Sequence, residues 1–266
     1  MQKAMMIVAA SSAMALASAA LASSYSFSSI GETYFQDFNS YMGTEATMPA
    51  HMFVTGENGA GDQYPGPFNP FTGVSSLADT SSPTWGEGFT AFTNGASGNS
   101  FGIRERGQTD LRDSRLFFEF TNNTGQAITG FNVSYDVEVW FHGQRANRIR
   151  MKYNTDTSGF SDIDDLTSTV NPLGPGGSGE FVDGSLEENR TEVSVFVDLI
   201  ALGFGPLADG ETAFFRWQYS NADGDSGSLR SGLALNNLSI TAVPAPAAFS
   251  LFGVASLVGA GRRRKQ

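Results

Sequence analysis

The sequence has no cysteine, so no disulfide can stabilise this 266-residue chain, and its stability must come from a hydrophobic core or a bound metal. Histidine is nearly absent too. Neither His51 nor His142 has neighbours that indicate a base held against a nucleophile and oriented by a carboxylate. The patterns HExxH and Walker A are missing. We therefore expect a protein that is not an enzyme, with a carboxylate-dependent glycoside hydrolase as the remaining catalytic alternative.

Basic residues are scarce. The chain carries 16 Lys and Arg against 27 Asp and Glu, which gives a formal net charge of −11. Nucleic acid is held mainly by Lys and Arg on phosphates, so we expect no nucleic-acid partner. An acidic surface suits solubility or divalent cations outside the cell.

Helical periodicity is also scarce, and alternation of apolar and polar residues is common. Residues 131–141 alternate throughout, as in a strand with one buried face. Residues 115–120 alternate as well, and the turn-rich connection 121–125 predicts a hairpin between these two runs. Further strands are predicted at residues 32–38, 89–93, 100–104, 146–154, 192–202, 212–219 and 232–241, with Gly/Pro loops at 56–73 and 172–179.

This pattern predicts an all-β fold, a β-sandwich or jelly roll, because several short strands are separated by turn signals. The run 32–38 is taken as the opening strand and 232–241 as the closing one. Both are apolar enough to pair with each other. Such pairing would bring the two ends of the domain together.

The N-terminal segment has the features of a secretory signal. Lys3 supplies the charged region, residues 5–16 form the apolar core, and Ala20-Leu21-Ala22 fits an A-x-A cleavage site. We expect a signal helix over residues 1–22, a mature chain that begins at Ser23, and an exported domain over residues 23–241.

The last 25 residues have three parts in a fixed order. A Pro-containing motif at residues 243–247 is followed by an uncharged apolar stretch, 247–261, and by a basic cluster, 262–265. The apolar stretch is short for a bilayer span, which needs about 17–25 residues, but it approaches that length if counted from Ala242. The basic cluster would remain on the cytoplasmic side. We expect a membrane-anchor helix, with an ordinary C-terminal core helix as the alternative.

This tail resembles the PEP-CTERM sorting signal of Gram-negative bacteria, with Pro244-Ala245-Pro246 where the usual motif is Pro-Glu-Pro. The resemblance implies recognition by an exosortase-like enzyme and cleavage near the motif. It also implies transient residence in the inner membrane and delivery to the cell surface or exopolysaccharide matrix. The residues that carry this sorting prediction are Val243, Pro244, Pro246, Arg262, Arg263 and Arg264.

The central region looks like a β-sandwich domain that is common in exported bacterial proteins. The segments that carry this resemblance are 120–125, 133–140, 215–217 and 233–240. It implies a fold and an extracellular setting without a particular activity. Such domains often have an acidic pair where this chain has Asn236-Asn237.

Two pairs of residues are candidate sites. Glu138 and Trp140 share the polar face of their strand and could bind a sugar by stacking and hydrogen bonding; the alternative is that a loop covers them, with Glu138 paired to an arginine. Asp223 and Asp225 flank a glycine, as calcium ligands in loops do, although a solvated turn explains the same residues. Calcium is therefore the one candidate cofactor.

Together these observations predict an exported, non-enzymatic protein that is a structural or adhesive component of exopolysaccharide. A carbohydrate-binding module is the main alternative, and a carboxylate-dependent hydrolase is a third.

Overall fold

The computed structural model describes residues 23–57, 63–64, 69–81, 85–105, 112–157, 161–162, 168–170, 179–222 and 229–244. Over these residues the protein is all-β, with single 3₁₀ turns at η1 (Glu45–Thr47) and η3 (Glu187–Asn189). Among them, no helix has the length and apolar character needed to span a membrane. The expected signal and anchor helices lie outside the described residues.

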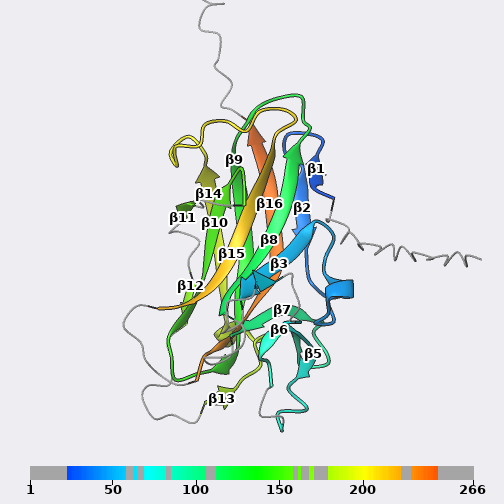
Figure 1. Ribbon diagram of the computed structural model, residues 1–266, viewed down its shortest axis with the longest axis vertical. Helices are drawn as coiled ribbons and strands as arrows, with labels where there is room; N and C mark the ends of the chain where they lie inside the picture. The colour runs from blue at the N-terminus through cyan, green and yellow to red at the C-terminus, as the bar shows by residue number, and fades with distance from the viewer. Residues whose placement is uncertain are drawn as a thin grey trace, which may run out of the picture.

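The described strands form two sheets, which face each other as a β-sandwich (Figure 1). The first sheet contains β1 (Tyr25–Phe27), β3 (Met52–Glu57), β4 (Gln63–Tyr64), β8 (Arg112–Asn122), β10 (Asn147–Asn154), β11 (Ser161–Asp162), β12 (Ser168–Val170) and β15 (Thr212–Asn221). The second contains β2 (Thr33–Gln36), β5 (Phe71–Ser76), β6 (Gly88–Thr93), β7 (Ser100–Arg104), β9 (Ile128–His142), β13 (Glu180–Phe181), β14 (Arg190–Asp198) and β16 (Gly232–Pro244).

The main path of the first sheet runs β11-β10-β15-β8-β3-β4, with β1 beside β8 and β12 beside β10. That of the second runs β13-β9-β16-β7-β6-β5, with β14 beside β9 and β2 beside β16. The second sheet curls, so that β5, β6 and β7 run across the lower end of the sandwich in Figure 1.

The principal core lies between the sheets and follows the predicted alternation from Phe131 to Val139. Phe141 was predicted for the same face but packs with Trp140 in the second cluster described below. From β9, the side chains of Phe131, Val133, Tyr135 and Val137 enter it, and Phe120 enters it from β8. Aromatic rings make many of the contacts; for example, Phe120 meets Phe131 edge-on, with ring centroids 5.1 Å apart. The all-β sandwich predicted from the alternation is therefore observed.

The predicted hairpin between β8 and β9 is wrong. The two strands belong to different sheets, and the connection 123–127 crosses from one sheet to the other. Asn122 explains the crossing: its Nδ2 donates to the carbonyl oxygens of Gln126 and Leu207, at 2.8 and 2.9 Å, and its Oδ1 accepts from Thr124. Turn residues are common to hairpins and to such arches, so composition alone did not separate them.

The predicted pairing of the opening and closing strands is observed, since β2 pairs antiparallel with β16 from Thr33↔Thr241 to Gln36↔Leu238. Seven strands were not predicted: β1, β3, β4, β5, β11, β12 and β13. The segment 56–73 was predicted to be a loop, but its beginning belongs to β3 and its end to β5. Gly73 takes a positive φ of 79° inside β5, at the irregularity in the pairing of β5 with β6 between Phe71 and Val74.

A second hydrophobic cluster covers the outer face of the curled sheet. It consists of Trp85, Phe92, Trp140, Phe141 and Ala234. Trp85 donates its Nε1 proton to the Ser76 carbonyl oxygen at 2.9 Å, which fixes the segment before β6 over this face. Part of the curled sheet is therefore buried on both faces.

Candidate functional site

Glu138 and Trp140 lie side by side on the outer face of β9, as predicted, but both are buried. Glu138 is 1% exposed and Trp140 is fully buried. Trp140 Nε1 donates to Glu138 Oε2 at 2.9 Å, and Asn236 Nδ2 donates to Glu138 Oε1 at 2.9 Å. Ser100 Oγ also donates to Oε2. The carboxylate of Glu138 thus connects β7, β9 and β16. Its hydrogen-bond donors are neutral side chains, whereas the alternative considered from the sequence was a pairing with an arginine.

The indole ring of Trp140 is covered on its faces. Phe92 stacks on it with centroids 5.6 Å apart and planes 9° apart. A Cβ added to Gly184 would lie 2.4 Å from Trp140 Nε1, so the loop after β13 touches the ring. The pair has no exposed surface on which a sugar ring could stack in this structure.

Next to Glu138, the carboxylate of Asp136 accepts a hydrogen bond from Asn237 Nδ2 at 2.7 Å, and Arg190 Nε lies 3.7 Å from it. Burial raises the pKa of Glu138, and the charge of Asp136 adds to the effect. The amides of Asn236 and Asn237 therefore face the two carboxylates. Among the described residues, no group of three or more His, Cys, Asp or Glu side chains is arranged to hold a metal.

Several predicted site residues lie outside the described residues: the calcium candidates Asp223 and Asp225, and the group Ala20, Ala22, Pro246, Arg262, Arg263 and Arg264. Val243 and Pro244 are described. They form the end of β16, where they pair with Gly130 and Ile128 of β9. The first two residues of the sorting motif are thus part of the folded sheet.

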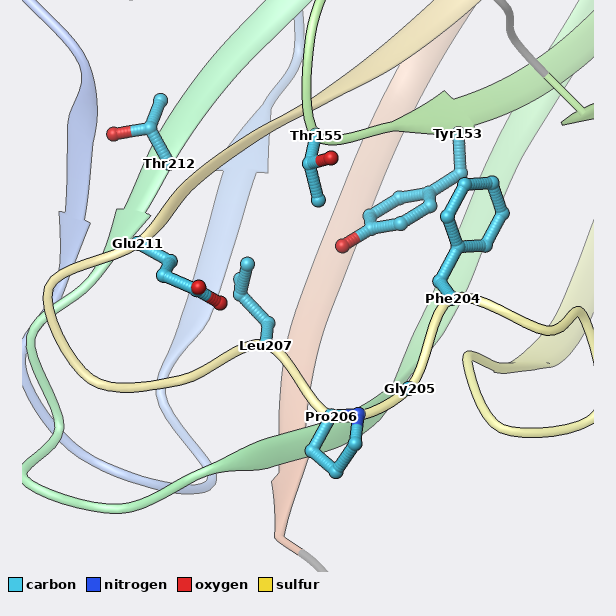
Figure 2. A pocket seen from close by; sticks show the side chains of 8 residues that line it. All are labelled: Tyr153, Thr155, Phe204, Gly205, Pro206, Leu207, Glu211 and Thr212. Carbon is cyan, nitrogen blue, oxygen red and sulfur yellow. The ribbon is translucent and has the colours of Figure 1, made fainter.

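A cleft of about 380 Å³ opens at one end of the sandwich (Figure 2). It lies between the end of β10 and the loop 199–211 that precedes β15. The lining residues are Tyr153, Thr155, Phe204, Gly205, Pro206, Leu207, Glu211 and Thr212. Its volume falls in the range of about 300–1,000 Å³ that is typical of small-molecule sites.

The floor of the cleft combines an aromatic pair with a polar atom that lacks a partner. Phe204 meets Tyr153 edge-on, with ring centroids 4.9 Å apart. Tyr153 is fully buried, and within the described part of the chain its hydroxyl makes no hydrogen bond. Figure 2 shows this hydroxyl directed between Thr155 and Leu207. Burial, and then the charge of Glu211, raises the pKa of Tyr153, so the hydroxyl stays protonated at neutral pH.

Glu211 is the carboxylate on the rim. Its Oε2 accepts a hydrogen bond from the Ala208 backbone N–H at 2.7 Å, which closes the loop on itself. Figure 2 shows the carboxylate turned toward Leu207 and the hydroxyl of Tyr153. The cleft therefore presents a carboxylate, hydroxyl groups and an aromatic ring within one opening.

The loop that carries Phe204 is held by its backbone. Leu207 and Ile128 exchange both backbone hydrogen bonds, at 2.8 and 3.0 Å, and Phe204 N–H donates to the Leu199 carbonyl at 3.0 Å. Asp198 Oδ1 caps the start of the loop by accepting from the N–H groups of Ile200 and Ala201. The cleft wall is thus formed before any ligand binds.

Sequence reasoning did not find this cleft. The available signal was Phe204-Gly205-Pro206, an aromatic residue beside turn residues directly after a predicted strand. Nothing in the sequence brings these residues to Tyr153, because the pairing of β10 with β15 across 59 or more intervening residues decides that contact.

No protein-family model and no curated protein matches the chain. Solved structures of similar architecture include the K2 adhesin domain of Lys-gingipain, with a TM-score of 0.41 and 15% identity over 79% of this chain and 97% of that one. The K1 adhesin domain of Lys-gingipain from Porphyromonas gingivalis W83 has a TM-score of 0.41 and 12% identity, over 80% of this chain and 99% of that one. A xylan-binding module has a TM-score of 0.35 and 11% identity, over 80% of this chain and 100% of that one. At these values the likeness is one of β-sandwich architecture only.

Proposed function

We propose that this chain is an exported, non-enzymatic protein of the cell surface or extracellular matrix, where it acts as a structural or adhesive component of exopolysaccharide. An exosortase-like system would sort it through the PEP-CTERM-like tail. The observation that supports the proposal is that the predicted motif begins inside β16, the last strand among the described residues. The folded domain and the predicted sorting signal would therefore be directly joined.

This junction has a physical consequence for processing. Thr129 Oγ1 donates to the Pro244 carbonyl oxygen at 2.9 Å, so the chain is tied to β9 up to Pro244. Removal of the tail beyond this point would leave the strand pairing of β16 intact. The product would be a folded domain that is no longer anchored to the membrane.

The experiment is intact-mass analysis combined with cell fractionation, with and without the sorting enzyme. We expect loss of the tail beyond Pro244 and a product outside the cell only when the enzyme is present. Pro244→Ala with Pro246→Ala should retain the full-length precursor at the inner membrane, whereas Pro49→Ala, a proline remote from the tail, should not. A full-length protein in the inner membrane of both strains would contradict the proposal.

Carbohydrate binding is the second candidate function, and the cleft at Tyr153 is the observation that favours it. Glu138 and Trp140 offer no exposed surface for that role. Paired-carboxylate hydrolysis gains no support from the cleft, since Glu211 is the single carboxylate among the described residues that line it.

A further inference from the structure

We propose that the cleft between the end of β10 and the loop 199–211 binds a neutral pyranose unit of a glycan, with Phe204 as the apolar contact and Glu211 and Tyr153 as hydrogen-bonding groups. This inference rests on the proposed matrix role in one respect, namely that the glycan would come from the exopolysaccharide matrix. The binding itself is a property of the folded domain.

The first argument is the hydroxyl of Tyr153. A buried hydroxyl without a hydrogen bond is destabilising, so such groups are uncommon unless a ligand or water satisfies them. This hydroxyl is directed into the region between Thr155 and Leu207 (Figure 2). A ligand hydroxyl that enters there would supply the missing partner.

The second argument is the combination of groups around the opening. A pyranose has hydroxyls at its edge and C–H groups on its faces, so it needs acceptors and donors beside an apolar surface. Glu211 supplies acceptors and Thr155 a hydroxyl, while Phe204 and Pro206 supply apolar surface. Small-molecule sites typically combine apolar lining with a few placed polar groups in this way.

The third argument concerns charge and rigidity. Glu211 would repel a uronic acid or a sulfated sugar, and the net charge of −11 adds to that repulsion. Among the described residues that line the cleft, none is Lys or Arg. Because Leu207 is tied to Ile128 and Glu211 to Ala208, the wall needs little ordering when a ligand binds. The site therefore suits a neutral sugar.

The test is ligand-observed NMR on the full chain in mild detergent, with the methyl pyranosides of glucose, galactose, mannose and xylose as probes. Methyl glucuronide serves as the charged comparison. We expect saturation transfer to at least one neutral probe and none to the glucuronide. Phe204→Ala and Glu211→Gln should each weaken binding of that probe by about tenfold, while Phe35→Ala and Glu45→Gln, at exposed positions outside the cleft, should leave it unchanged.

Tyr153→Phe gives the sharpest comparison, because it removes one oxygen and keeps the ring. If the hydroxyl bonds the ligand, affinity falls about 2- to 12-fold, the equivalent of one hydrogen bond, while the domain stays folded by circular dichroism. Unchanged affinity in Tyr153→Phe, Phe204→Ala and Glu211→Gln would overturn the proposal, as would the absence of binding to all four neutral probes. Glu211→Gln lies on the surface and remains informative if Phe204→Ala fails to fold.

The two proposals fail separately. A protein that reaches the matrix but binds none of the four neutral probes overturns the sugar site and leaves the export proposal standing. A protein that binds a neutral probe through the cleft yet remains full-length in the inner membrane overturns the matrix role and leaves the site standing.

Discussion

Trp140 Nε1 donates a hydrogen bond to Glu138 Oε2 at 2.9 Å, two residues away on the same face of β9. Both side chains are buried under the second hydrophobic cluster. A pair that resembles a sugar-binding site in sequence is thus a buried polar contact in the fold, and it makes defined predictions about stability.

The Glu138→Gln substitution should change how stability depends on pH. Burial raises the pKa of Glu138 above its unfolded value of about 4.3, so its stabilising contribution is complete below that value and is lost as pH rises through the folded pKa. Glutamine stays neutral throughout. The unfolding free energy of the variant, measured with urea in steps from about pH 4 to 8, should therefore rise relative to wild type as pH increases.

The control for that experiment is Glu45→Gln, which alters an exposed carboxylate on η1. It should follow the wild-type pH profile. If the difference in unfolding free energy between Glu138→Gln and wild type is the same at every pH, folding does not shift the pKa of Glu138 and the assignment of its raised pKa is incorrect.

Trp140→Ala should destabilise the domain by about 3–5 kcal/mol, the range for truncating a large buried aromatic side chain. The loss includes the stacking with Phe92 and the contact with the loop at Gly184. Chemical denaturation measures it, with Phe35→Ala, 59% exposed, as a control expected to stay within about 0.5 kcal/mol. A wild-type stability for Trp140→Ala would show that the cluster does not form.

Gly43→Ala should be more damaging than Gly31→Ala, although both glycines have positive φ. An added Cβ at Gly31 meets no atom within 4 Å, so only the left-handed backbone costs energy, about 1–2 kcal/mol. At Gly43 the Cβ would lie 1.9 Å from the carbonyl oxygen of Gly73, and that backbone would have to move. Thermal denaturation of both variants checks the order; equal losses would refute the close approach.

Asn122→Ala should cost about 1–3 kcal/mol, because this fully buried side chain bonds Gln126, Leu207 and Thr124 and holds the arch between the sheets. Since Leu207 lines the cleft, binding of the neutral methyl pyranoside should weaken as well. The neighbour Asn123, which is exposed, is the matched control. If Asn122→Ala unfolds at the same urea concentration as Asn123→Ala, the arch does not depend on these bonds.

The sequence alone determined that the domain is all-β and which side chains of β9 face the core from Phe131 to Val139, because a strand fixes its two faces with a period of two residues. It also placed β14, β15 and β16 within a few residues of their observed bounds. Local chemistry is sufficient for these features. The prediction of a sorting tail rests on residue order alone and remains a prediction, as does the calcium loop at Asp223 and Asp225.

Only the tertiary structure decided how the strands combine. The connection between β8 and β9 has hairpin composition but crosses between sheets, because Asn122 satisfies backbone groups of Gln126 and Leu207. Polar Glu138 is buried because Ser100 and Asn236, from two other strands, donate to it. Tyr153 and Phe204, which have 50 residues between them in the sequence, are in contact in the cleft. These outcomes depend on contacts between distant segments, which periodicity and turn chemistry do not encode.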